Sequence, residues 1–455
     1  MNNSETQYIE LYEQYRSIID SHSCEPMNAC RAAACETLRA KGLPTRKVED
    51  YKYTNMQELF APDYGVNITR LSVQVNPYDA FKCDVPNLST QLYFVVNDTL
   101  SSALPRKEGL PEGVIVCSLC AAAEQYPELL AKHYNRLTDD DPVTALNTML
   151  SQDGLFVYVP KGVAVKNVIQ VVNILTAPQL SKGGEASEGM MSNRRVLIVA
   201  EEQSSVKLLF CDHAADDHHF LTTQTMEVFV GENADVEIYG LEETHQKNVL
   251  VANTYIEQQR SSRLHHDLIT LHNGKTRQLT KLTFAGEGAE CWLNGGVIAD
   301  KEQRVDNNTL IDHAVPHCDS HELYKYVLDN EAVGAFAGKV LVRKDAQKTT
   351  SEETNQNLLS TKSARMYTQP MLEIYADDVK CSHGSTVGQL NDKALFYMQQ
   401  RGISLKEARL LLQTAFITEV VDNIPLTPLR DRLHYLIDKR FRGELSKCEG
   451  CKLCK

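Results

Sequence analysis

A thiol and an imidazole stand two residues apart at Cys381 and His383, and glycines follow at positions 384 and 388. If this stretch is extended, alternate side chains share a face, so the two groups would point the same way. A thiol and an imidazole on one face could share a metal or sulfur atom, or act as a nucleophile and its base. The residues leave this interpretation and simple core packing open as alternatives.

Three cysteines near the C-terminus form a second candidate site. Cys448, Cys451 and Cys454 have the spacing of an iron–sulfur binding run, but such runs use a fourth thiol. A short charged tail that carries three thiols is the simpler interpretation, and transient capture of iron or zinc is the alternative. The metal-binding hypothesis for this tail therefore rests on spacing alone.

Two further groups of ligating residues favour structural roles. His313, His317 and His321 are four residues apart, which places ligands on one face only in a helix, and their context is typical of strands and loops. Cys117 and Cys120 form a C-x-x-C without a second such pair nearby, so packing is favoured over a metal or redox role.

Nucleotide binding by this chain is not expected. Gly274, Lys275 and Thr276 resemble the end of a phosphate-binding loop, but Ile269 stands where that motif needs glycine. A turn between two strands explains the three residues better. If ATP is used, another chain must bind it.

The overall composition restricts the class of protein. The chain has 455 residues, a net charge of −13 and 42% hydrophobic residues, which is typical of a large soluble protein with more than one domain. The negative charge argues against binding to nucleic acid or to anionic membranes. The N-terminus lacks a secretory signal, and no apolar run of about 18 residues predicts a membrane span. We therefore expect a cytoplasmic protein whose 13 cysteines are mostly reduced.

The elements that must position Cys381 and His383 change in type along the chain. Up to residue 150 we expect mainly helices, including 5–42 and 121–133, with short strands at 93–96 and 114–117. From 154 to 374, short apolar runs recur roughly every ten residues without intervening helices, which predicts an all-β region. A β-helix built from stacked rungs is favoured, and a β-sandwich of this length is the alternative. Residues 181–192 are glycine-rich and predict a surface loop.

After residue 390 the pattern becomes helical. Ser404 and Glu407 have the spacing of a capping box, and the helix that follows has an apolar stripe. A last amphipathic helix is expected at 429–441. The predicted organisation is therefore a mainly helical region at 1–150, a β-helix at 151–390, a helical region at 391–445 and a cysteine-containing tail at 446–455.

Several stretches together resemble a known family. They include Asp-Val-Lys-Cys-Ser-His-Gly-Ser-Thr-Val-Gly at 378–388, Leu-Phe-Tyr-Met at 395–398 and Arg-Gly-Ile at 401–403, supported by the segments 42–54 and 346–360. In this combination the chain resembles the SufB/SufD family of iron–sulfur cluster assembly, and is most similar to its SufD branch. The match runs from about residue 40 to about residue 440.

The resemblance implies a fold and a set of partners. It implies a right-handed parallel β-helix flanked by helical regions, a heterodimer with SufB through the β-helix edges, and a homodimer when the chain is isolated. It also implies that the C-terminal helices bind SufC, an ABC-type ATPase that supplies the nucleotide site. The residues expected at that contact are Leu395, Phe396, Tyr397, Gly402, Ala408 and Leu411.

The resemblance also implies a role for Cys381 and His383. His383 corresponds to the interface histidine that helps to hold a transient iron–sulfur cluster with SufB, and Cys381 lies beside it. The expected function is a non-catalytic scaffold. Some complexes of the family carry a reduced flavin, which these residues neither favour nor exclude. The alternatives are a SufB-like paralogue, for which Cys291 or Cys318 would be the catalytic cysteine, and a β-helix enzyme, which would need paired carboxylates in a groove.

Overall fold

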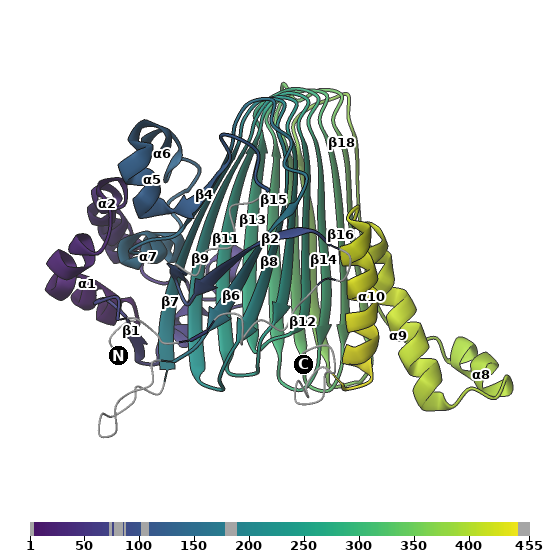
Figure 1. Cartoon of the computed structure of the whole chain (residues 1–455). Coiled ribbons are helices and arrows are strands. Elements are labelled where there is room, and N and C mark those ends of the chain that lie inside the picture. The colour runs from purple at the N-terminus through teal and green to yellow at the C-terminus, as the bar shows by residue number, and fades with distance from the viewer. Residues whose placement is uncertain are drawn as a thin grey trace, which may run out of the picture.

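Two facing sheets form the core of the computed structural model, which describes residues 4–71, 75–76, 85, 88–101, 109–177 and 189–444 (Figure 1). Each sheet has ten strands, and along most of its length neighbours in a sheet are two strands apart in the sequence and parallel. The chain therefore passes alternately through one sheet and the other, as in a β-solenoid. The predicted mainly β fold with a β-helix core is confirmed, and the β-sandwich alternative is wrong.

The first sheet contains, in spatial order, β19 (Arg365–Ile374), β17 (Val333–Val342), β15 (Arg304–His313), β13 (Lys275–Phe284), β11 (Asn248–Gln258), β9 (His219–Val230), β7 (Gly189–Ala200), β5 (Leu155–Val159) and β4 (Ile115–Ser118), while β1 (Tyr64–Val66) pairs with β7. The second contains β20 (Lys380–Gln389), β18 (Thr350–Leu359), β16 (Asp319–Leu328), β14 (Glu290–Ala299), β12 (Arg263–His272), β10 (Asp235–Glu243), β8 (Ser205–Ala214), β6 (Val168–Leu175), β2 (Thr90–Val96) and β3 (Thr99–Leu100).

The turns of the solenoid repeat with the rungs. A residue with positive φ lies two positions before each strand from β8 to β18 in the second sheet; these residues are Gln203, Asn233, Ser261, Gly288, His317 and Lys348. In five of these six turns the backbone amide of the positive-φ residue donates to the turn of the next rung, as from Asn233 to Arg260 at 2.8 Å. Each turn joins strands of different sheets, so hairpin sequences of the Asn-Gly type are not required.

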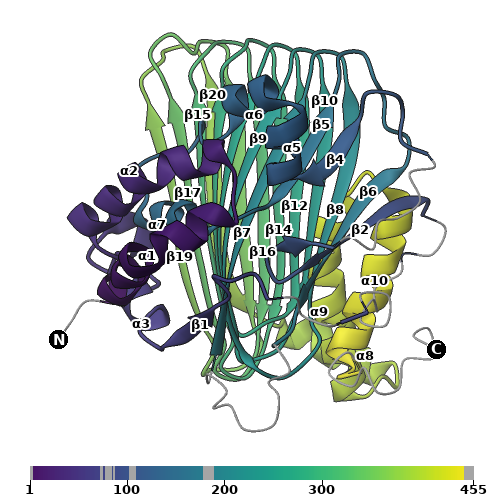
Figure 2. The same ribbon diagram turned by 60° about the vertical axis from the view of Figure 1, so that its left-hand side comes forward.

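The N-terminal region covers the outer face of the first sheet (Figure 2). Its helices are α1 (Ser4–Ser21), α2 (Glu25–Lys41), the short η1 (Glu49–Tyr51), α3 (Met56–Leu59), α5 (Leu119–Gln125), α6 (Pro127–His133) and α7 (Pro142–Leu150). On α7, the Asn147 side-chain amide donates to the Arg194 carbonyl at 3.0 Å and to the Thr223 hydroxyl at 2.9 Å. These buried hydrogen bonds attach the helical region to β7 and β9.

The C-terminal helices lie against the second sheet. They are α8 (Asp392–Gln400), α9 (Leu405–Asp422) and α10 (Thr427–Phe441). On α9, Ile417 and Val420 join the apolar cluster that contains Val327 of β16. On α10, the Arg440 guanidinium lies 2.9 Å from the Asp300 carboxylate. Helix α8 projects beyond α9 and away from the sheets (Figure 1). Among the described helices, none combines the length and the apolar character needed to cross a membrane.

Two local predictions are wrong. The helix expected at 121–133 is two helices, because Tyr126 precedes a proline and adopts φ −138° and ψ 54° before α6 begins at Pro127. The loop expected at 181–192 becomes strand β7 from Gly189, and residues 181–188 lie outside the described ranges. A side chain at Gly189 would come within 2.7 Å of the Tyr64 ring, so this glycine allows β1 to pair there.

Candidate functional site at the end of the solenoid

The last rung of the solenoid is an open edge. Strands β19 and β20 are the final strands of their sheets, so within the described residues each has a hydrogen-bonded neighbour on one side only. Four large apolar side chains are exposed at this end, namely Tyr367, Ile374, Tyr375 and Val387. An edge strand that exposes apolar side chains is typical of a surface that pairs with another chain.

Cys381 and His383 lie on β20 and share its inward face. Cys381 is in register with Ser351 and His383 with Glu353, and both partners are buried. The imidazole of His383 is exposed at the open end, whereas Cys381 is half-buried against a cluster that includes Val340. Burial raises the pKa of the Cys381 thiol. The predicted common face is therefore present, and the histidine is the more accessible of the two groups.

A column of polar groups continues inward from Cys381. Ser351 accepts a hydrogen bond of 2.8 Å from the Ser320 hydroxyl, and Ser320 lies 2.9 Å from the Nε2 of His313. Cys291 follows in register on β14, fully buried. Burial lowers the pKa of His313 to about 3, so this imidazole is neutral.

A second column, beneath His383, contains two buried carboxyl groups. Glu353 is in register with both His383 and Glu322, and the two glutamates are 1% and 3% exposed. Within the described residues the two Glu353 oxygens have no hydrogen-bond partner, and Thr309 is the polar side chain beside Glu322. A side chain at Gly338 would come within 2.2 Å of the Glu353 carboxyl, so the glycine provides the space for it.

Both carboxyl groups hold their protons to a higher pH than an exposed glutamate does. Burial raises the pKa of Glu322 to about 7. Burial, followed by repulsion from Glu322, raises the pKa of Glu353 to about 10. At neutral pH the pair therefore holds at least one proton directly beneath the exposed imidazole. Neither glutamate was among the candidates predicted from the sequence, although the spacing of about 30 residues between rungs connects Glu322, Glu353 and His383.

The predicted contact residues on the C-terminal helices form two groups, one exposed and one buried. Phe396 and Tyr397 on α8 are 62% and 58% exposed, and Leu411 on α9 is also exposed. Leu395 and Ala408 are buried within this chain. Gly402 has a φ of 83° in the turn between α8 and α9, which favours glycine. The turn and the buried pair thus position an exposed apolar surface, which we call the α8–α9 surface and define as Phe396, Tyr397, Leu405 and Leu411.

The other candidates from the sequence do not converge on a site. His313 is buried in the core, His317 lies in a turn, and His321 stacks on Trp292 with ring centroids 5.7 Å apart. Among the described residues, no group of three or more His, Cys, Asp or Glu side chains is arranged to hold a metal ion. Cys448, Cys451 and Cys454 lie outside the described ranges.

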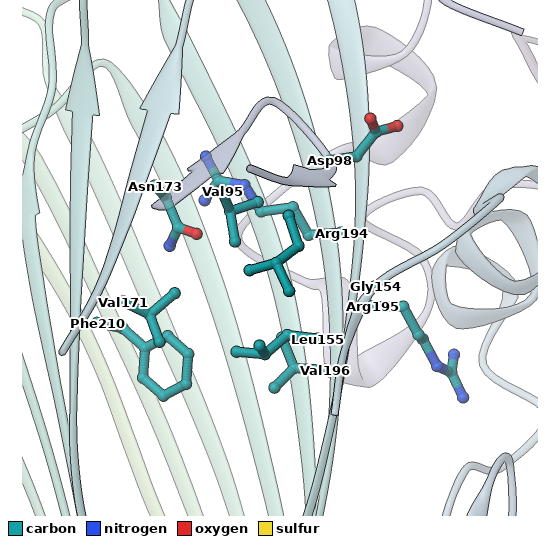
Figure 3. A pocket seen from close by; sticks show the side chains of 11 residues that line it. Val95, Asp98, Gly154, Leu155, Val171, Asn173, Arg194, Arg195, Val196 and Phe210 are labelled. Carbon is teal, nitrogen blue, oxygen red and sulfur yellow. The ribbon is translucent and has the colours of Figure 1, made fainter. Parts of the chain in front are cut away.

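A small cavity lies at the opposite end of the solenoid, between β2, β6 and β7 (Figure 3). Its volume is about 10 Å³, and its lining is mostly apolar, with Leu155, Val171 and Phe210 among the residues. That volume suits no more than a single water molecule. Arg195 points away from it toward the N-terminal helices, where it pairs with Glu227 at 2.7 Å. This cavity does not form a ligand site.

Comparison with known proteins shows the family to which the chain belongs. The family described as "SUF system FeS cluster assembly, SufBD core domain" matches residues 183–416, and "SufBD protein N-terminal region" matches residues 2–171. The chain belongs to the SufBD family. This family is involved in iron–sulfur cluster assembly, and its core domain includes the solenoid end that carries His383.

Individual members of the SufBD family match along most of their length. An iron–sulfur cluster assembly SufBD family protein of Synechocystis is 28% identical over 90% of this chain and 90% of its own. The iron–sulfur cluster assembly protein SufD of Escherichia coli is 27% identical over 90% of this chain and 92% of its own. The SufD of Bacillus subtilis is 26% identical over 94% of this chain and 98% of its own. The predicted resemblance to SufD is therefore confirmed.

Proposed function

We propose that this chain is a scaffold subunit of a SUF complex and performs no catalytic turnover of its own. The observation that carries the proposal is the open terminal rung, which presents the exposed His383 on an unpaired strand edge in a member of the SufBD family. A scaffold needs an accessible ligand at an interface, and this edge supplies one.

The partner at the open edge is SufB. The free sides of β19 and β20 offer unpaired backbone groups, and the exposed Tyr367 and Val387 offer apolar contact area. Addition of strands from a second solenoid would satisfy both. In the absence of SufB, the same edge would pair with a second copy of this chain.

The cargo at this interface is a transient iron–sulfur cluster. The imidazole of His383 would contribute a nitrogen ligand, a group that suits iron, and SufB would contribute a cysteine thiolate. Cys381 is the secondary candidate, because its thiol is half-buried and its raised pKa disfavours the thiolate.

The nucleotide-binding partner is SufC, and its docking site is the α8–α9 surface. Phe396 and Tyr397 are the kind of large, exposed apolar anchors that dominate protein interfaces. Leu395 and Ala408 support that surface from within the chain. The SufB-like alternative is less well supported, because burial raises the pKa of both Cys291 and Cys318, which makes each a poor sulfur acceptor.

The test is substitution of the exposed imidazole in the assembled complex. His383→Ala should leave binding to SufB and SufC intact and lower the rate of cluster assembly at least tenfold, measured by cluster absorbance during reconstitution. Ser382→Ala is the matched control, because its side chain lies on the opposite face of the same strand. Cluster assembly at the normal rate by the His383→Ala complex would refute the assigned role.

A further inference from the structure

A hollow between the N-terminal region and the first sheet is lined by charged side chains. Its volume is about 430 Å³, and ligand pockets in proteins commonly measure about 300–1,000 Å³, so a small molecule can enter it. The charged side chains in its lining are Arg46, Lys275, Arg304, Glu58, Glu302 and Glu331. Their signs and their arrangement indicate what kind of molecule the hollow suits.

Hydrogen bonds hold the two walls of the hollow together. The Thr54 hydroxyl, in the N-terminal wall, donates to the Asp306 carboxylate of β15. The Arg277 guanidinium of β13 donates to the Asp50 carbonyl of the same N-terminal segment at 2.7 Å. The N-terminal wall is therefore attached to the strands that form the opposite wall.

In the second sheet, charged residues that are in register on neighbouring strands have opposite signs and form ion pairs. Lys207 of β8 pairs with Glu237 of β10. Asp235 of β10 and Arg263 of β12 are 3.0 Å apart. Opposite charges on neighbouring strands stabilise a sheet, and like charges directly opposite each other destabilise it. These pairs therefore neutralise their charges within the chain.

In the hollow, two neighbouring charges have the same sign instead. Lys275 and Arg304 are in register on β13 and β15, and both are exposed. Arg46 lines the hollow from the N-terminal region. Among the described residues, none of these three side chains forms an ion pair or a hydrogen bond. An anion in the hollow would neutralise the like-charge pair.

Two carboxylates are also neighbours in this hollow. Glu302 and Glu331 each lie two residues before a strand of the first sheet, in successive turns, and the Glu331 amide donates to the Lys301 carbonyl at 3.0 Å. Within the described part of the chain, neither carboxylate has an ion pair or a hydrogen bond. Glu58 differs, because it accepts a hydrogen bond of 2.8 Å from the Asn55 amide. The pair Glu302 and Glu331 therefore suits a cationic group.

We propose that this hollow binds an acidic amino acid, a zwitterion with two carboxylates and one ammonium group. Arginine binds a carboxylate through two parallel hydrogen bonds, so Arg46 and Arg304 each hold one carboxylate. Lys275 adds positive charge beside Arg304. Glu302 and Glu331 accept hydrogen bonds from the ammonium group. This inference is independent of the function proposed for the solenoid end.

The first test is isothermal titration calorimetry of the full-length chain with L-glutamate as the probe. We expect a Kd below about 1 mM. Arg304→Gln should weaken binding roughly tenfold or more, because it removes a bidentate contact with a carboxylate. Lys47→Gln is the matched control, since Lys47 is an exposed neighbour of Arg46 outside the lining, and it should leave the affinity unchanged. Circular dichroism verifies that each variant is folded.

The second test separates the ammonium contact from the carboxylate contacts. Glutarate has the two carboxylates of L-glutamate and lacks the ammonium group, so it should bind the wild type roughly tenfold more weakly or worse. The double variant Glu302→Gln, Glu331→Gln should lose most of its affinity for L-glutamate. Its preference for L-glutamate over glutarate should disappear.

Three results would overturn the proposal. The first is the absence of binding at about 10 mM L-glutamate. The second is equal affinity of the wild type for glutarate and L-glutamate, which would make the hollow a site for anions alone. The third is an equal loss of affinity in Lys47→Gln and Arg304→Gln, which would mean that net charge and not the hollow determines binding.

Discussion

At the scale of single residues, the pair of buried carboxyl groups beneath His383 makes stability depend on pH. The folded pKa values of Glu322 and Glu353, about 7 and about 10, lie above the ordinary value of 4.5. For each glutamate, between pH 4.5 and its folded pKa, the folded state binds more protons than the unfolded state. The free energy of unfolding therefore falls as pH rises through that range. Each group contributes a slope of about 1.4 kcal/mol per pH unit within its own window.

Glu353→Gln should remove one of these slopes. Between pH 5 and pH 8 the free energy of unfolding of the variant should fall less steeply than that of the wild type, by about 1.4 kcal/mol per pH unit. Urea unfolding at four pH values measures the difference. Glu352→Gln is the control, since Glu352 is exposed on the outer face of the same strand. Parallel pH profiles for Glu353→Gln and the wild type would contradict the presence of a buried proton.

At the scale of elements, features set by neighbouring residues could be predicted from the sequence. The pairing of strands between rungs could not. The capping box at Ser404 was predictable because its hydrogen bond from the Glu407 amide spans three residues. The position of Glu353 beneath His383 follows only from the register between β18 and β20, and that register cannot be read from the sequence.

The helices after the solenoid give a prediction at this same scale. Replacing both Phe396 and Tyr397 with alanine should weaken SufC binding about 30-fold or more, because each substitution removes a large apolar anchor from the α8–α9 surface. Isothermal titration calorimetry with purified SufC measures this. Lys393→Ala, an exposed substitution on α8, should leave the affinity unchanged. Retained affinity in the double variant would place the SufC contact elsewhere.

At the scale of the whole molecule, the N-terminal region reaches the terminal rung. The Tyr53 hydroxyl donates to the Gln369 side chain of β19 at 3.0 Å, and the Tyr53 ring stacks on Tyr367 with centroids 5.1 Å apart. The Gln369 amide in turn donates to Glu49 at 2.9 Å. The polar segment 42–54 therefore supports the edge strand that we assign to SufB pairing.

Tyr53→Ala tests whether this support matters for the edge. Loss of the stacked pair and its hydrogen bond, together about 1–2 kcal/mol, should raise amide hydrogen exchange in β19 about 5- to 30-fold. The same change should weaken SufB binding, because a partner would then have to order the strand on which it docks. Lys47→Ala, exposed in the same segment, should change neither quantity. If faster exchange in Tyr53→Ala stayed within residues 42–54 and β19 kept its protection, the terminal rung would be stable without the N-terminal region, and the SufB edge would be a property of the solenoid alone.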